Sequence, residues 1–187
     1  MPPKIKTTKD AIVKTALDVV REKGIDAINA REIARRLNCS TQPIFFNFNS
    51  MDDLKKEVIN SAGDIYRQYL KNEEDKQEYP LYKATGMAYI RFAKEETELF
   101  KLLFMRDRSA EKTKDDETFS DVIEIARETT GLSREKTLLF HLEIWAFVHG
   151  IATMVATNYT HLEWDLISSM VTDAYQGLKK RYGDKNK

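Results

Sequence analysis

Amide and hydroxyl side chains gather in a short segment near the start of the chain. The hydroxyl of Thr41 and the amides of Gln42 and Asn47 lie within six residues of one another. On the outer face of a helix, such groups can read base edges in the major groove of DNA, and Gln can pair with adenine through two hydrogen bonds. The methyl group of Thr41 and the ring of Pro43 can contact thymine methyl groups. The chemistry that this segment predicts is recognition of a base sequence.

Basic residues near this segment can supply contacts to the phosphate backbone, which give a protein most of its affinity for DNA. They are Lys4, Lys6, Lys9, Arg31, Arg35 and Arg36. Residues 1–56 carry 11 Lys and Arg against 7 Asp and Glu, whereas residues 57–187 carry 19 against 23. Scattered solvated charges can also give so small an imbalance, so charge alone does not decide the function.

A helix-turn-helix unit is the arrangement that would present this segment to DNA. Apolar residues spaced three and four apart predict a first helix over residues 7–23. Asn29 can cap a second, short helix, and Ser40 can cap a third helix that has Pro43 in its first turn. The outer face of that third helix would carry Thr41, Gln42, Pro43, Phe46 and Asn47. A plain three-helix bundle would show the same apolar spacing, so this alternative stays open at this point.

The remainder of the chain also predicts helices, about nine in all, and no strand. Gly and Pro are scarce, at 7 and 4 of 187 residues, and no apolar alternation of period two occurs. Further helices are expected over residues 51–72, 80–95, 98–105, 117–130, 133–158 and 162–182, with a charged loop at 106–116. The predicted fold class is all-α, with a helix-turn-helix head at residues 1–50 and a larger helical body at residues 51–187.

The stretch at residues 28–54 resembles the DNA-binding signature of TetR/AcrR-family repressors, and it reads INAREIARRLNCSTQPIFFNFNSMDDL. The layout of the whole chain is similar to that family as well. The resemblance implies a homodimeric repressor that binds a palindromic operator in double-stranded DNA and is released from it by a small-molecule inducer. The residues expected to contact DNA are Lys6, Asn29, Arg31, Thr41, Gln42, Pro43, Phe45, Asn47 and Asn49.

Two residues depart from the family pattern at positions that contact the phosphate backbone. Phe45 takes the place of a Tyr and lacks the hydroxyl that would donate to a phosphate. Met51 takes the place of a Lys at the start of the fourth predicted helix. We therefore expect a shallower salt dependence of DNA binding than in a typical member. The alternative is a helical ligand-binding or protein-interaction bundle that has lost specific DNA binding.

The eighth predicted helix is apolar over most of its circumference, which requires burial against both its own core and a partner. The resemblance implies a dimer interface made by the last two helices and a ligand cavity inside the body. Residues 145–150 (WAFVHG) also resemble the signature of a family subgroup named for Trp, His and Gly. The candidate ligand-binding residues are Tyr66, Tyr69, Tyr89, Phe92, Phe100, Phe104, Trp145 and His149. The same aromatic spacing is typical of a helix core, and His149 of a hydrogen-bonded core histidine, so both interpretations stay open.

No motif for catalysis or metal binding stands out in the sequence. A di-iron bundle needs Glu three residues before His, where this chain has Leu138, Ala146 and Asn158. Gly-rich phosphate loops and GxSxG elbows do not occur. The chain has one cysteine, Cys39, no apolar secretory stretch at its start and no charge-free run long enough to span a membrane. The sequence predicts a cytoplasmic protein that is not an enzyme, with no metal, no cofactor and no membrane span.

Overall fold

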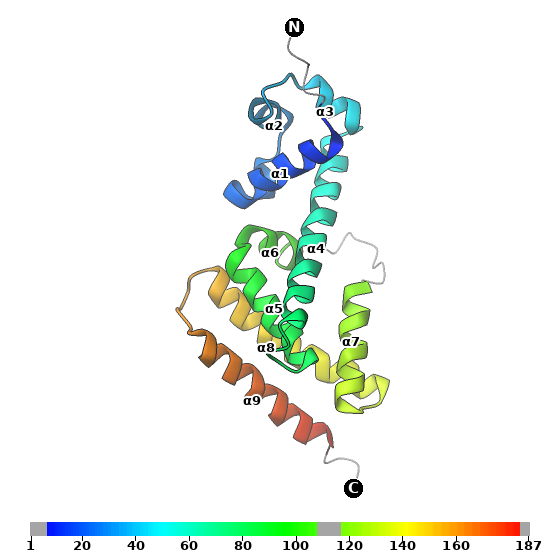
Figure 1. The fold of residues 1–187 in the computed structure, drawn as a ribbon, viewed down its shortest axis with the longest axis vertical. Helices are drawn as coiled ribbons and strands as arrows, with labels where there is room; N and C mark the ends of the chain where they lie inside the picture. The colour runs from blue at the N-terminus through cyan, green and yellow to red at the C-terminus, as the bar shows by residue number, and fades with distance from the viewer. Residues whose placement is uncertain (1–6, 108–116, 184–187) are drawn as a thin grey trace. The chain divides into compact units, whose positions relative to one another are not determined.

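The structure is a computed structural model, and it describes residues 7–107 and 117–183. Within these ranges all regular secondary structure is helical, which confirms the predicted all-α fold (Figure 1). A single 3₁₀ turn, Ile25–Ala27, follows the first helix. The α-helices are α1 (Lys9–Lys23), α2 (Ala30–Arg36), α3 (Gln42–Asn47), α4 (Met51–Asp75), α5 (Leu81–Glu95), α6 (Thr97–Phe104), α7 (Glu117–Thr130), α8 (Arg134–Ala156) and α9 (Trp164–Gly183). Most of the predicted loop at 106–116 lies outside the described residues.

The residues form two compact units by their mutual contacts. The first unit comprises Met1–Ile65 and Glu96–Arg106, and the second comprises Tyr66–Glu95 and Asp107–Lys187. The long helix α4 begins in the first unit and ends in the second. This grouping by contact differs from the predicted functional domains at residues 1–50 and 51–187, which stay a prediction.

The core of the first unit lies between α1, α2, α3 and the start of α4. Its buried apolar residues are Ile12, Ala16, Leu17, Val19, Val20, Ile33, Ala34, Ile44, Phe48, Leu54 and Val58. The apolar spacing of α1 predicts a buried face of Ile12, Val13, Ala16, Leu17 and Val20, but Val13 is half-buried and Val19 is fully buried instead. The helix α6 also packs against α1, and Arg21 donates to both carboxylate oxygens of Glu96 at 2.8 and 2.7 Å. Nothing in the local sequence pattern indicates this contact between distant segments.

Side-chain caps explain where several of these helices begin. The oxygens of Thr8, Asn29 and Ser50 accept hydrogen bonds from backbone N–H groups three residues ahead, at 3.2, 2.9 and 3.1 Å. The predicted cap of α3 was wrong by one residue, because Thr41 rather than Ser40 precedes its first helical residue. The carbonyl of Thr41 accepts from the N–H of Ile44, which is the first donor available after Pro43.

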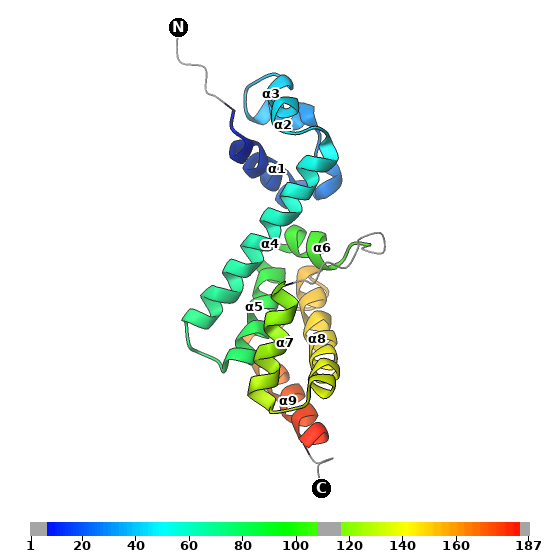
Figure 2. The same ribbon diagram turned by 90° about the vertical axis from the view of Figure 1, so that its right-hand side faces the viewer.

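The second unit is built around the pair α5 and α8, which lie side by side (Figure 2). The helices α7 and α9 both pack against α8. Large buried residues along this seam include Met87, Ile90, Phe92, Phe140 and Ile151. A Cβ at Gly86 would lie 3.5 Å from the side chain of Val148, in ordinary van der Waals contact, so Gly86 faces α8 across this seam.

The helix α8 is buried on one side and remains apolar on the other. Five large apolar side chains on this helix are 38–50% exposed, and we call them the α8 apolar face: Leu138, Leu139, Leu142, Trp145 and Phe147. By length and composition alone, α8 is long and apolar enough to cross a membrane. Its opposite side, with Phe140, Ile144 and Val148, is part of the core of the second unit.

Candidate nucleic-acid interface

The helix α3 holds most of the predicted base-reading residues on its solvent side. Ile44 and Phe48 are buried in the first unit and fix the orientation of the helix. The exposed residues at and after α3 are Gln42, Phe45, Phe46, Asn47 and Asn49, whereas Thr41 and Pro43 are half-buried. The alternation of buried and exposed positions therefore leaves a polar and aromatic surface that is free to meet another molecule.

The turn before α3 has a backbone that only a few residue types accept easily. Asn38 has a φ of 50°, in the left-handed region that Asn tolerates better than most residues. The N–H of Cys39 donates to the carbonyl of Ala34 at 3.0 Å, which closes the end of α2. This compact turn confirms the predicted helix-turn-helix connection and positions α3 beside α2.

Asn47 has part of its hydrogen-bonding capacity committed within α3. Its side-chain Nδ2 donates to the backbone carbonyl of Pro43, one turn earlier, at 2.7 Å. The side chain keeps its Oδ1 acceptor and one further N–H for other partners. Gln42 makes no such local bond in the described part of the chain, so its whole amide is available.

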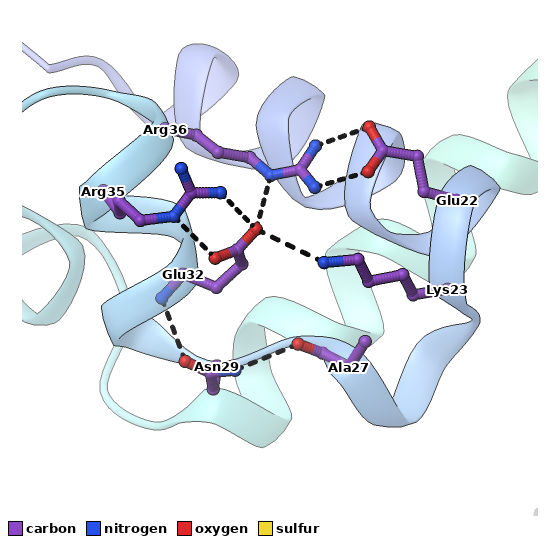
Figure 3. A network of polar contacts seen from close by, with 7 residues as sticks. All are labelled: Glu22, Lys23, Ala27, Asn29, Glu32, Arg35 and Arg36. Atoms are coloured by element: carbon purple, nitrogen blue, oxygen red, sulfur yellow. Dashed lines mark hydrogen bonds and ion pairs between the residues drawn. The ribbon is translucent and has the colours of Figure 1, made fainter.

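A network of ion pairs links α1 to α2 beside this surface (Figure 3). Arg36 donates through its two terminal nitrogens to the carboxylate oxygens of Glu22 at 2.8 and 2.6 Å. Its Nε donates to Glu32 at 2.9 Å, and Arg35 donates to the same carboxylate at 2.9 and 2.8 Å. These hydrogen bonds lower the pKa of the Glu32 carboxyl to about 2. Glu32 is therefore the acidic centre of this network.

The network changes the expected roles of the basic residues on α2. The side chain of Arg36 is only 18% exposed and lies between two carboxylates, so its main role is to hold α1 and α2 together. Arg35 is exposed but paired. Arg31 is exposed, and no ion pair holds it in the residues that the structure describes. It is therefore the available cation on α2.

Of three further residues that were expected to contact DNA, two make contacts within the protein and one lies outside the residues that the structure describes. Asn29 caps α2, and its Nδ2 also donates to the carbonyl of Ala27 at 3.1 Å. Lys9 pairs with Glu57 and joins α1 to α4. Lys6 lies outside the described residues. Sequence reasoning found the exposed face of α3 and the cap at Asn29, but not the pairing of Lys9 with Glu57, which joins residues 48 positions apart.

We expect the substitution Glu32→Gln to steepen the salt dependence of DNA binding. It removes a negative charge and releases Arg35, whose side chain is 69% exposed. Each additional cation that contacts a phosphate steepens the fall of log affinity with log salt concentration, by up to about one unit of slope. Affinity for a fixed DNA duplex at several salt concentrations measures this slope.

The control for this prediction is Glu124→Gln on α7 in the second unit. Glu124 forms an ion pair with Arg127, three residues later, just as Glu32 does with Arg35. We expect the control to keep the wild-type slope. A Glu32→Gln variant with the wild-type slope would contradict the account.

Six of the eight candidate ligand-binding residues form one aromatic cluster in the second unit. The ring of Tyr66 lies 5.9 Å from that of Tyr89 and 5.3 Å from that of Phe92, between centroids. Tyr69 also contacts Phe92, at 5.3 Å. His149 joins the cluster through stacking on Trp145 at 5.2 Å and a hydrogen bond of 2.8 Å with Tyr89. The other two candidates, Phe100 and Phe104, lie on α6 in the first unit, with centroids 5.5 Å apart.

A separate pocket of about 450 Å³ opens between α4, α5 and α7 in the second unit. Its volume is in the range of small-molecule sites. Apolar side chains and charged side chains both line it: Arg67, Leu70, Lys71, Glu74, Asp75, Leu81, Ala84, Thr85, Asp121, Val122 and Ile125. None of the eight candidate residues belongs to this lining. The sequence did not indicate this pocket, because its residues come from three separate helices and form no motif along the chain.

Two Tyr–His pairs connect α5 to α8 along their common seam. The hydroxyl of Tyr82 lies 2.9 Å from Nδ1 of His141, and that of Tyr89 lies 2.8 Å from Nδ1 of His149. Burial lowers the pKa of His141 to about 4 and also lowers the pKa of His149. Burial raises the pKa of both tyrosines, so each pair joins a protonated hydroxyl to a neutral imidazole, and the tautomer of the imidazole sets which of the two donates.

The stability of the chain should fall as the pH drops from about 6.5 to about 4, because unfolded His141 binds a proton that the folded state excludes. At pH 5 we expect a loss of about 1–2 kcal/mol in the free energy of unfolding. The substitution His141→Gln, which keeps an acceptor for Tyr82, should remove most of this slope in urea titrations at several pH values. The matched control is His161→Gln at an exposed position. A full wild-type slope in His141→Gln would contradict the assignment.

Comparisons with known proteins agree with this architecture. Residues 12–58 match the sequence model for bacterial regulatory proteins of the tetR family, and residues 82–173 match that for a tetracyclin repressor-like C-terminal domain. Among curated protein sequences, none matches the chain significantly. The predicted subgroup named for Trp, His and Gly stays a prediction.

Solved structures with the same fold include two transcriptional regulators. A TetR-like regulator from Rhodococcus sp. RHA1 is 16% identical, with a TM-score of 0.67 over 100% of both chains. A transcriptional regulator from Aquifex aeolicus VF5 is 18% identical, with a TM-score of 0.59 over 93% of this chain and 99% of that one. The two sequence models together span most of the chain, including the helix-turn-helix and the α5–α8 seam. The chain belongs to the TetR family of DNA-binding transcriptional regulators.

Proposed function

We propose that this chain is a homodimeric repressor that a small molecule releases from a palindromic operator, and that it acts in the cytoplasm. The observation that carries the proposal is the surface of α3, where Gln42 and its exposed neighbours are held outward by buried Ile44 and Phe48. In a dimer, two such helices separated by about one turn of DNA (~34 Å) would enter successive major grooves. A palindromic site follows from the two-fold symmetry of such a dimer.

The proposed base contacts come from Arg31, Thr41, Gln42, Pro43 and Asn47. Gln42 supplies a full amide, and Arg31 supplies a guanidinium that no ion pair holds among the described residues; these are the groups that bind adenine and guanine edges. The proposed backbone contacts come from Lys6, Asn29, Phe45 and Asn49, together with the N–H groups at the start of α4. Phe45 can offer only van der Waals contact there, because it has no hydroxyl.

The proposed dimer interface is the α8 apolar face together with α9. Leu166 on α9 is 50% exposed and adds to the apolar surface. A Cβ built at Gly150 on α8 or at Gly177 on α9 would meet nothing within 4 Å, so both positions leave room for a second helix to approach closely. Exposed apolar area of this extent is typical of a surface that another protein covers.

The proposed inducer binds in the second unit, where two places are candidates. One is the aromatic cluster, whose proposed ligand-binding residues are Tyr66, Tyr69, Tyr89, Phe92, Trp145 and His149. The other is the pocket between α4, α5 and α7. The helix α4 passes from one unit into the other, so a ligand that favours one placement of α4 would change the affinity for DNA. Bound DNA would then change the affinity for the ligand by the same factor.

Selection of sites from random DNA duplexes by the purified chain tests this proposal. We expect enrichment of a palindrome, and repression of a reporter when that palindrome overlaps its promoter. Enrichment with activation of the reporter would make the chain an activator instead. A folded dimer that enriches no sequence at low salt would contradict the proposal and favour the bundle that has lost specific DNA binding. The missing hydroxyl at Phe45 and the missing charge at Met51 are the observations behind that second candidate.

A further inference from the structure

Phe46 is a large apolar side chain that the fold leaves in water. It is 82% exposed, although Ile44 and Phe48 two residues to either side are buried, and its neighbour Phe45 is 53% exposed. Burial of a Phe side chain contributes ~1.5–3 kcal/mol, which the free chain forgoes at this position. Two adjacent exposed aromatic rings on a helix of 6 residues indicate a surface that another molecule covers.

Phe46 shares a face of α3 with Gln42. The two residues are four positions apart, or about one helical turn and ~6 Å of rise, and both are exposed. Asn47, the next residue, is tied back to the carbonyl of Pro43. The face of α3 that carries the uncommitted amide of Gln42 therefore also carries the exposed ring of Phe46.

The major groove offers an aromatic ring few suitable partners. Guanine, cytosine and adenine present hydrogen-bond donors and acceptors there, whereas thymine also presents a C5 methyl group. A ring placed over a donor or acceptor strips it of water without replacing the hydrogen bond, which is unfavourable. A ring placed over a thymine methyl buries apolar surface on both sides and leaves no polar group unpaired.

We propose that Phe46 recognises the C5 methyl group of a thymine in each half of the operator, close to the base that Gln42 reads. This inference rests on the proposed function, since it requires α3 to lie in the major groove. It adds a residue that determines base preference to the polar contacts proposed above.

The test uses the palindrome that the wild-type chain selects, with one thymine per half-site replaced by deoxyuridine, which lacks only the methyl group. We expect one symmetric position at which this replacement weakens wild-type binding by about fourfold per half-site, because burial of one methyl group is worth about 0.8 kcal/mol. The variant Phe46→Ala should bind the thymine site more weakly than the wild type and should be indifferent to deoxyuridine at that position.

The matched control is Phe45→Ala, which removes the adjacent exposed ring. It should keep the sensitivity to deoxyuridine at the position in question, and the melting temperature of both variants should stay near that of the wild type. A wild-type chain that tolerates deoxyuridine everywhere, or a Phe46→Ala variant that stays sensitive, would overturn the inference while leaving a selected site intact. Failure to select any site would instead remove the proposed function, and the inference with it.

Discussion

The substitution Leu142→Glu is expected to convert the proposed dimer to a monomer and to lower the affinity for a palindromic site at least 100-fold. Leu142 lies between Leu138 and Trp145 on one stripe of the α8 apolar face, at spacings of four and three residues. In a two-fold symmetric interface each substitution occurs twice, so one change introduces two carboxylates. A carboxylate that is buried in an interface without a positively charged partner costs several kcal/mol of the free energy of association. Two such carboxylates are therefore expected to keep the two copies apart.

The affinity for DNA is expected to fall because a monomer cannot bind both half-sites of the palindrome at once. Two heads in one dimer engage two half-sites with an effective concentration far above that of free monomers, and this advantage is worth about 10²–10⁴ in affinity. Sedimentation velocity gives the oligomeric state, and a titration of labelled operator gives the affinity. We expect the two quantities to change together in this variant.

Arg134→Glu provides the matched control for this experiment. It places the same new carboxylate on α8, at an exposed position outside the α8 apolar face. It should leave both the dimer and the DNA affinity close to those of the wild type. A dimer that survives Leu142→Glu with its affinity intact would show that another surface joins the two copies.

The second large effect is expected at Gln42. Removal of its amide by Gln42→Ala should weaken binding to the selected site by about 5- to 150-fold per half-site, because one bidentate pair with a base is worth ~1–3 kcal/mol of discrimination. Selection repeated with the variant should give a relaxed preference at one symmetric base pair. Binding to unrelated DNA should stay unchanged, because phosphate contacts carry that affinity.

The control for Gln42→Ala is Gln68→Ala on α4. Gln68 is also an exposed amide, and its Nε2 donates a hydrogen bond of 2.7 Å to Oδ1 of Asn72 within the same helix. Its removal should leave the site preference unchanged. An equal loss on the selected site and on unrelated DNA in Gln42→Ala would mean that Gln42 contacts the backbone and reads no base.

Much of the fold could be predicted from the sequence because its signals are local. The spacing of apolar residues predicted the α-helices of the described residues, though not the 3₁₀ turn Ile25–Ala27, and the caps at Asn29 and Ser50 depend on residues only three positions apart. The start of α3 was misplaced by one residue because Ser40 and Thr41 are both good capping residues, and only the backbone geometry separates them. The exposed face of α3 also follows from local periodicity.

The contacts that could not be predicted join residues far apart in the chain. The pairing of Arg36 with Glu22 spans 14 residues and depends on how α1 crosses α2. The pairing of Arg21 with Glu96 spans 75 residues and assigns α6 to the first unit. Composition correctly indicated a basic N-terminal region, but it could not tell which of these cations are already paired. The available positive charge around α3 is therefore smaller than the sequence implies.

Recognition of a DNA sequence by the exposed face of α3 can be tested by comparing two affinities of the wild-type chain, one for its selected palindrome and one for a scrambled duplex of the same length, at several salt concentrations. We expect a preference of at least about 10³ for the palindrome at physiological salt, and an affinity for both duplexes that falls with salt. Equal affinity for the two duplexes at every salt concentration would contradict it, because phosphate contacts alone would then explain all binding.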